Sequence, residues 1–380
     1  RVNDSIGSLF MGTLSTASKL VLVGLGGLVF AAIETRYSLW RMDRGSLATW
    51  VFAFVAYDFC YYWSHRLGHE RQIFWASHVA HHQSEEYNLT TALRQTSTGF
   101  LLTWLFYIPM FLVGVPAEVF ITVGSANLLY QYWVHTEHIP KLGWYEWIFV
   151  TPSNHRVHHA QNDVYIDRNY GGLFILWDRL FGTFQEELEE EPVVFGIRGA
   201  LNSWNPARAL THVYVDMAQD SWRTARWSDK LRVWWGRTGW RPADVARLYP
   251  RDKTDLGHFR KYEPAVPLVV SVYAFAQLLS VIGLLSFMQH AQLGYWTGVM
   301  LWALLLATTV TTALWLEAST PANVTRWEML RLAALLALLL LGWSNGMPGM
   351  VLAAGVLYLV LNLAALPLLS ESPKETVAAA

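Results

Sequence analysis

Long apolar stretches separated by polar ones dominate the chain, and most reach or approach the length of a membrane-spanning helix. In the first half they cover residues 9–33, 48–63, 100–113 and 119–133. In the second half they cover residues 266–287, 295–316, 329–343 and 350–369. Because about 18 to 25 apolar residues cross a bilayer as a helix, the pattern predicts an all-α, polytopic membrane protein.

The first four stretches are predicted to form a four-helix transmembrane core. The short connection Val113-Gly114-Val115-Pro116 makes the third and fourth spans an antiparallel hairpin. The second and fourth spans run directly into His65 and His135, so we expect both residues at the same membrane face. About four further C-terminal transmembrane helices follow; we expect no paired polar residues in them and a structural or lipid-facing role.

The polar stretches divide the chain into five expected segments. These are an N-terminal helix and loop (1–47), the core domain (48–215), a Trp/Arg-rich interfacial segment (216–263), the C-terminal transmembrane helices (264–370) and a polar tail (371–380). Interleaved basic and aromatic residues also occur in RNA-binding proteins. Here, spans on both sides favour a segment that lies among lipid headgroups.

The composition agrees with a membrane protein and argues against several kinds of partner and metal site. Only 15% of the residues are charged, against about 25% in soluble domains. The net charge of −1 gives no reason to expect nucleic acid as a partner. The single Cys60 excludes an internal disulfide framework and a cysteine-rich metal site. Lys and Arg in residues 139–265 place the histidine-rich side in the cytoplasm, and we expect a bacterial inner membrane.

Ten of the 13 histidines fall between residues 65 and 159. Their offsets of three and four place side chains on one face of a helix. One metal accepts at most about six ligands, so this many imidazoles indicate two metals. The predicted ligands are His65, His69, His78, His81, His82, His135, His138, His155, His158 and His159.

The type of ligand narrows the chemistry. Neutral imidazole suits iron, copper, zinc and nickel, and the absence of Cys and Met from the pattern disfavours copper(I) transport. An imidazole-bound pair of irons at a bilayer surface fits O₂ activation and hydroxylation of a lipid C–H bond. A desaturase on the same site is an alternative. A metal transporter or sensor is another, but it requires polar residues along the spans.

Other polar residues could orient the histidine rings or act in catalysis. Asp58 lies within a predicted span, where an ionisable side chain is costly unless it has a partner. Glu137 lies between His135 and His138, and Asn154 precedes His155. We expect Asp58, Glu137 and Asn154 at the catalytic site. Carboxylates and amides are expected to hold the second nitrogen of each ring, with Glu85, Glu86 and Asn169 as further candidates.

The histidine motifs and their flanking sequences resemble those of a known family. The flanks are EEYNLTTALRQ at 85–95, DRNYGG at 167–172 and WDRLFGTF at 177–184. With the intervening transmembrane hairpin, they are similar to the fatty acid hydroxylase and sterol desaturase superfamily of membrane di-iron enzymes, and within it to the alkylglycerol monooxygenases and their bacterial relatives. The similarity is strong over residues 48–185.

The resemblance implies a reaction and its cofactors. Two iron ions would be bound by the eight histidines of the HxxxH and HxxHH motifs, with His135 as an additional position. O₂ would be the co-substrate, and the carbon next to the ether oxygen of a glyceryl ether lipid would be hydroxylated. Tetrahydrobiopterin, or another pterin or an electron-donor protein, would supply electrons. Hydroxylation of a fatty acid, sterol or other lipid is the alternative.

Overall fold

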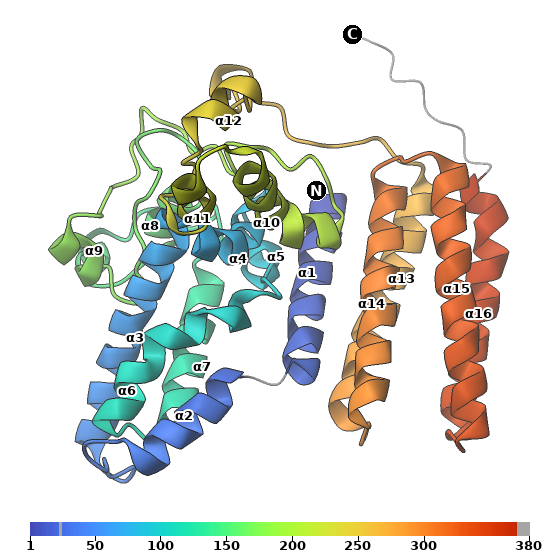
Figure 1. Cartoon of the computed structure of the whole chain (residues 1–380), viewed down its shortest axis with the longest axis horizontal. Coiled ribbons are helices and arrows are strands. Elements are labelled where there is room, and N and C mark those ends of the chain that lie inside the picture. Colours follow the sequence, from blue (N-terminus) through green and yellow to red (C-terminus); the bar gives the residue numbers. More distant parts are fainter. Residues whose placement is uncertain (23–24, 371–380) are drawn as a thin grey trace. The chain divides into compact units, whose positions relative to one another are not determined.

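The computed structural model describes residues 1–22 and 25–370, and this part of the chain consists of helices and loops without a β-strand. The expected tail at 371–380 lies outside the described residues. The chain divides into two compact units. Unit 1 comprises Arg1–Val21, Asn202–Ala209 and the chain from Lys261 onward, and unit 2 comprises Leu22–Leu201 and Leu210–Arg260 (Figure 1).

Two long helices organise unit 2: α3 (Leu47–Glu70) and α7 (Ala117–Trp133). At 1.5 Å per residue, the 24 residues of α3 extend for about 36 Å. The two helices pack along each other. Six buried residues form an apolar core here: Ala53, Cys60, Met110, Val115, Val119 and Val123. Because α3 continues without a break beyond the apolar stretch 48–63, its last turns carry His65 and His69.

The expected turn between the third and fourth spans is present. Gly114 has a φ of 99°, a left-handed conformation that favours glycine. A Cβ atom at this position would lie 1.8 Å from the carbonyl oxygen of Trp40, so any side chain would displace the backbone. Pro116 then precedes the first residue of α7.

The third span was predicted as one helix over 100–113, and this was wrong. The segment consists of the 3₁₀ helices η1 (Gly99–Leu101) and η2 (Thr103–Tyr107), followed by the short α6 (Ile108–Val113). Pro109 accounts for the break. It has no N–H, and its ring would collide with the preceding turn of a continuous α-helix.

Unit 1 contains α1 (Val2–Val21) and the C-terminal helices α13 (Leu268–His290), α14 (Tyr295–Leu316), α15 (Pro321–Ser344) and α16 (Gly349–Ser370). Among the described residues, α13, α14 and α16 are long and apolar enough to cross a membrane. A fourth candidate arises if α1 and the helix after it count together as one broken span. An integral membrane protein is therefore supported, while the expected total of about eight spans stays a prediction.

The first predicted span, 9–33, does not form one helix of the core. α1 packs on α13 and α14 in unit 1, whereas α2 (Leu25–Arg36) packs on α6 and α7 in unit 2. Residues 23–24 lie outside the described part. Polar side chains on α1 favour its place in unit 1, since Ser18 accepts a 2.9 Å hydrogen bond from the indole N–H of Trp302.

The expectation that the C-terminal helices carry no paired polar residues was also wrong. On α15, Glu328 and Arg331 form a 2.7 Å ion pair, and their side chains are 0% and 1% exposed. Arg331 also donates to the hydroxyl of Tyr358 and to Oδ1 of Asn362, both at 2.7 Å. Three residues of α13 and α16 complete this network with each other and with Glu328: Tyr273, Gln277 and Asn362. The partners come from three helices, of which α15 and α16 are consecutive and α13 is more distant in sequence.

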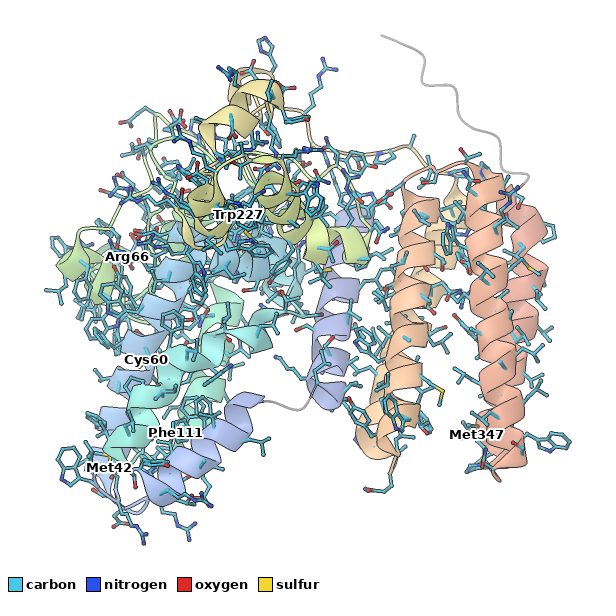
Figure 2. All side chains as sticks on the ribbon, in the orientation of Figure 1. Met42, Cys60, Arg66, Phe111, Trp227 and Met347 are labelled. Atoms are coloured by element: carbon cyan, nitrogen blue, oxygen red, sulfur yellow. The ribbon has the colours of Figure 1, made fainter. Side chains whose placement is uncertain are left out.

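Nine further helices belong wholly or mainly to unit 2, and the first of them packs on α3. They are α4 (Gln72–His82), α5 (Leu89–Leu93), η3 (Gly143–Trp147), α8 (Pro152–His158), α9 (Leu176–Phe181), α10 (Pro206–Arg223), α11 (Trp227–Trp235), α12 (Ala243–Leu248) and η4 (Leu256–His258). Figure 2 shows mainly carbon around Cys60 and Phe111, whereas nitrogen and oxygen atoms gather around Arg66 and Trp227. Unit 2 thus has an apolar part and a polar end.

Candidate metal centre

Nine of the ten predicted ligands come together in two groups at the polar end of unit 2. In each group, the candidate ligand nitrogens all lie within 4.8 Å of one another. Metal group A contains His65, His69, His78, His82 and His158. Metal group B contains His81, His135, His155 and His159. The groups adjoin, because the rings of His82 and His159 stack with their centroids 4.3 Å apart.

Helix periodicity explains how α4 serves both groups. His78 and His82 are four residues apart and share one face, and their Nε2 atoms lie 3.0 Å apart in group A. His81 turns toward group B, where its Nε2 atom lies 3.4 Å from that of His135. The motif HxxHH therefore presents ligands to both metal groups rather than to one.

The helix α8 divides its ligands in the same way. His155 and His159 belong to group B, with their Nε2 atoms 3.2 Å apart. His158 belongs to group A, and its ring centroid lies 4.3 Å from that of His65 on α3. Two copies of the same motif on facing helices thus build two adjoining groups.

Backbone carbonyls fix the orientation of four rings. In each, Nδ1 lies 2.8–3.0 Å from a carbonyl oxygen: His65 with Tyr170, His81 with Arg94, His135 with Gln131, and His158 with Arg168. An Nδ1–H that donates to a carbonyl leaves the Nε2 lone pair free for a metal. For these four rings, the expectation of carboxylate or amide partners was wrong. Sequence spacing gives no signal for such carbonyls.

The environment of the grouped histidines favours their neutral form. Burial lowers the pKa of His81 to about 4, and burial together with neighbouring imidazoles lowers the pKa of His155 and His159 well below the usual range. Neutral imidazole is the form that binds metal. The Nε2 atoms of His69 and His158 are buried without a hydrogen-bond partner in the described part of the protein. Leaving such atoms unpaired costs about 1–3 kcal/mol each, which a bound metal would offset.

His138 and Glu137 lie outside both groups, and both side chains are exposed. The backbone N–H of His138 donates to Oγ1 of Thr136 at 3.1 Å. Because α7 ends at Trp133, His135 and His138 do not share a helix face, and the expectation based on their spacing does not apply. The catalytic role of Glu137 stays a prediction.

Asp58 anchors a loop rather than a histidine ring. Its fully buried carboxylate accepts hydrogen bonds from Nδ2 of Asn127 (2.6 Å), the backbone N–H groups of Leu173 (2.8 Å) and Phe174 (3.0 Å), and the indole N–H of Trp177 (3.0 Å). Asp58 therefore fastens the segment before α9 to α3 and α7. These hydrogen bonds explain how a buried carboxylate is accommodated in an apolar helix.

Asp178 on α9 completes the support of this loop. Its two carboxylate oxygens accept the N–H groups of Tyr170 and Gly171, each at 2.7 Å. Burial raises the pKa of Asp178 to about 6. Since the carbonyl of Tyr170 holds His65, Asp178 acts on group A through the backbone. A Cβ at Gly172 would lie 2.7 Å from the ring of Tyr61, which requires glycine at this crossing. Sequence reasoning assigned Asp178 no role.

Asn154 fixes the start of α8. Its Oδ1 accepts the N–H of Thr151 at 3.2 Å, and its own N–H donates to Oγ1 of Thr151 at 3.4 Å. This reciprocal capping box sets where α8 begins and hence where His155 and His158 point. Asn154 therefore positions the ligand histidines, and its expected catalytic role stays a prediction.

Comparisons with known proteins cover the region that carries both metal groups. Residues 50–183 match the family model described as fatty acid hydroxylase. The chain is 38% identical over 294 residues to the alkylglycerol monooxygenase of Xenopus tropicalis, which covers 77% of this chain and 65% of the relative. The human alkylglycerol monooxygenase is 40% identical over 242 residues, or 64% of this chain and 54% of the relative. No solved structure matches the chain.

A more distant relative is bacterial. The ornithine lipid hydroxylase OlsE of Rhizobium tropici is 30% identical over 150 residues, or 39% of this chain and 45% of the relative. The chain spans between about half and two thirds of the length of the frog and human relatives. All nine grouped histidines lie within the stretch that matches the family model. On these matches, residues 50–183, which carry both metal groups, resemble the fatty acid hydroxylase family.

Proposed function

We propose that this chain is an iron-dependent lipid monooxygenase that uses O₂. The observation that carries the proposal is the pair of adjoining all-histidine groups with their nitrogens converging within 4.8 Å. Metal group A would hold one iron and metal group B the other. Bound iron would supply the activation of O₂. The relatives are named as monooxygenases and hydroxylases, which supports the reaction class.

The proposed substrate is a glyceryl ether lipid. The similar proteins from frog and human are named alkylglycerol monooxygenase. In the proposed reaction, one oxygen atom enters the C–H bond next to the ether oxygen and the other leaves as water. A donor supplies the required two electrons, and two protons are taken up. The resulting hemiacetal breaks down to an aldehyde and glycerol.

The chain's own residues would position the ligands and limit access of water. Backbone carbonyls orient four rings, Asp58 and Asp178 hold the loop around Tyr170, and Asn154 sets the start of α8. Eight of the nine grouped histidines are buried and His78 is half-buried. A dry site favours oxidation of the lipid over side reactions with water.

The electron donor and the membrane side belong to this proposal as well. Tetrahydrobiopterin, or a donor protein, would deliver the electrons; the family resemblance is its support. We propose that the histidine groups face the cytoplasm, because basic residues are abundant in residues 139–265. The expected bacterial inner membrane has little support, since the frog and human relatives are eukaryotic. We also propose that residues 216–263 lie at the headgroup level.

Another lipid is a second candidate for the substrate. Relatives also include a fatty acid hydroxylase, vlmA of Lecanicillium sp, and human lathosterol oxidase, at 28% and 27% identity. A desaturase on the same histidines remains an alternative reaction. The non-enzymatic alternative is a metal transporter or sensor; the convergence of nine histidines in two groups at one end of unit 2 favours a fixed metal centre over a route along the spans.

The test is turnover of a defined ether lipid by purified, iron-loaded protein. A 1-O-alkylglycerol is supplied with ¹⁸O₂, tetrahydrobiopterin and a system that removes the aldehyde as a stable derivative. We expect the aldehyde, with label recovered in its carbonyl when exchange is suppressed by immediate reduction. His158→Ala should abolish it. Formation of an alkene would favour desaturation, and oxidation of free fatty acid or sterol alone would move the substrate to another lipid.

A further inference from the structure

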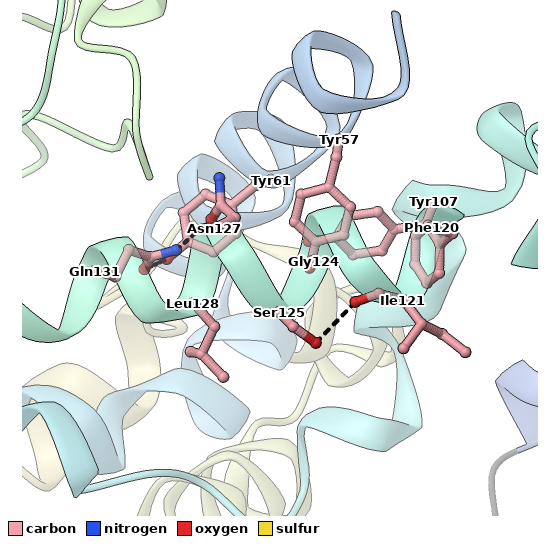
Figure 3. A pocket seen from close by; sticks show the side chains of 10 residues that line it. All are labelled: Tyr57, Tyr61, Tyr107, Phe120, Ile121, Gly124, Ser125, Asn127, Leu128 and Gln131. Atoms are coloured by element: carbon pink, nitrogen blue, oxygen red, sulfur yellow. Dashed lines mark hydrogen bonds between the residues drawn. The ribbon is translucent and has the colours of Figure 1, made fainter. Parts of the chain in front are cut away.

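An open groove of about 280 Å³ runs between α3, α7 and η2 (Figure 3). Its walls differ along its length. At one end stand the apolar or aromatic side chains of Tyr107, Phe120 and Ile121. At the other end stand Tyr61 and Gln131, with Asn127 beside them. From Phe120 to Gln131 the axis of α7 rises by about 16 Å, so the groove is long and narrow.

The polar end is a chain of hydrogen bonds. The hydroxyl of Tyr61 donates to Oε1 of Gln131 at 2.7 Å, and Nε2 of Gln131 donates to Oδ1 of Asn127 at 2.6 Å. Phenol and amide groups can bond an ether oxygen or a hydroxyl, but not a methylene. The groove thus offers a polar terminus to one end of a ligand and apolar walls to the remainder.

The polar end lies beside both metal groups. Tyr61 precedes His65 by one helical turn, and the centroids of their rings are 5.2 Å apart. Gln131 precedes His135 by one turn, and its carbonyl holds His135 Nδ1 at 2.8 Å. His65 belongs to group A and His135 to group B. The two walls of the groove therefore lead to one ligand of each group.

The outer face of α7 shows what the groove opens to. Ile121 and Leu128 line the groove and are 63% and 59% exposed, and neighbouring Leu129 is 74% exposed. Large apolar side chains exposed in this number on one helix form an apolar surface that suits contact with hydrocarbon. A molecule entering between α3 and α7 would come from the bilayer.

We propose that this groove binds the alkyl chain of the substrate, with the headgroup end at Tyr61 and Gln131 and the chain tail at Phe120. The proposal rests on the proposed function. It fixes the position of attack: the oxidised carbon is next to the headgroup, because the chain runs away from the histidines. A carbon near the middle of the chain would lie along α7, remote from both metal groups.

Gly124 sets the width of the groove halfway along it. A Cβ at this position would lie 2.9 Å from the ring of Tyr57, which stacks on Tyr107 with centroids 4.9 Å apart. Any side chain at Gly124 must therefore displace the ring of Tyr57, and Gly124→Leu is expected to obstruct the groove at this point, seven residues before Gln131. A matched control is Ala56→Leu, which fills a second groove of about 400 Å³, lined by Phe59, Cys60 and Trp63 among others.

The experiment compares turnover of 1-O-alkylglycerols with short and long saturated chains. Gly124→Leu should lower kcat/KM for the long chain by on the order of tenfold or more relative to the short one, since two lost methylene contacts already give this factor. Ala56→Leu should leave the ratio unchanged, and both variants should retain iron. Equal activity of Gly124→Leu on both chains, or a chain-length effect in Ala56→Leu instead, would overturn the proposal.

A second measurement uses the unmodified protein and does not depend on turnover. An alkylglycerol with a photoreactive diazirine at its chain end is crosslinked in bilayer nanodiscs, and the labelled peptide is identified. Label on residues 117–125 supports the groove, and competition by unlabelled alkylglycerol should remove it. Label mapped to single residues and confined to those that line only the second groove, such as Phe52, Phe59, Leu105 and Met110, would place the chain there and defeat the proposal. If α7 is labelled specifically but the alkylglycerol is not oxidised, the proposed function fails while the groove proposal stands.

Discussion

His135 illustrates how much a single ligand depends on its surroundings. It follows the end of α7, so helix periodicity does not determine its direction; the carbonyl of Gln131 does. Its Nε2 atom lies 3.2 Å from that of His155 and 3.4 Å from that of His81. Three residues later in the chain, His138 is exposed. Two histidines with similar sequence context therefore have different expected roles.

Substitution of His135 and His138 should have different effects on the iron content of the protein. We expect His135→Ala to lower the iron content of the purified protein by about one ion per chain, because group B would keep only three histidines. His138→Ala should retain the full content. Elemental analysis of both variants, prepared together with wild type, measures this difference. Loss of iron in His138→Ala to the same extent would assign His138 to the ligand set.

At the scale of elements, the segment between α8 and α9 supports the metal groups from outside. Asp58 and Asp178 hold its backbone, and the carbonyl of Tyr170 passes this support to His65. Left-handed φ angles of 59° at Asp167 and 55° at Asn169 allow the chain to turn tightly before Tyr170. Asn side chains adopt this conformation at less cost than most residues.

Asp58→Ala should loosen this segment. Two loop N–H groups, the indole N–H of Trp177 and the amide of Asn127 would lose their acceptor. Each buried unpaired donor costs about 1–3 kcal/mol. We therefore expect a loss of about 3 kcal/mol or more in stability and weaker iron retention. Thermal unfolding in detergent and elemental analysis measure both. Asp163→Asn, a change in a largely exposed side chain, is the control. An unchanged melting temperature in Asp58→Ala would contradict the anchoring role.

Asp178 should contribute a pH dependence of known sign. Because burial raises its folded-state pKa to about 6, above the usual 3.8, the folded protein binds this proton more tightly than the unfolded chain. The contribution of Asp178 to stability is therefore full below about pH 4 and decreases as the pH rises toward 6. Measured from pH 4 to 7, the melting temperature of wild type relative to Asp178→Asn should fall. A rising difference would contradict the raised pKa.

The two units have different kinds of interior. Unit 2 combines an apolar core at Ala53 and Val119 with the histidine groups, whereas unit 1 places an ion pair and its amide and phenol partners among apolar helices. Breaking a buried pair by removing one partner leaves an uncompensated charge, while replacing both can be nearly neutral. The network in unit 1 joins α13, α15 and α16, so its stability should depend on both members of the ion pair.

Arg331→Met should destabilise the protein by about 3–5 kcal/mol, because it leaves Glu328 buried without its partner. The double variant Glu328→Gln/Arg331→Met should recover much of that loss. Iron content should not change in protein that remains folded, since the metal groups belong to unit 2. Unfolding midpoints and iron content of the three proteins test this. Equal destabilisation in single and double variants would contradict a role that depends on charge pairing.

The sequence predicted the grouping of the histidines better than the packing of the helices. The number of clustered histidines indicated two sets of ligands, although their spacing did not show that each HxxHH motif is divided between both groups. Continuous apolar stretches indicated α3, α7 and the C-terminal helices. The carbonyls that orient the rings could not be predicted, because every residue has one. The place of α1 and the partners of Arg331 depend on contacts between separate helices. The periodicity argument for His138 required a helix that had already ended at Trp133.

The iron content of the purified wild-type chain tests the central claim most directly. The protein is prepared from iron-replete cells, or loaded anaerobically with ferrous iron, and freed of loosely bound metal. Metal and protein are then measured in the same sample, by elemental and amino-acid analysis. Metal groups A and B predict about two irons per chain. A ratio near one, or the absence of iron with zinc in its place, would contradict a di-iron centre built by these nine histidines.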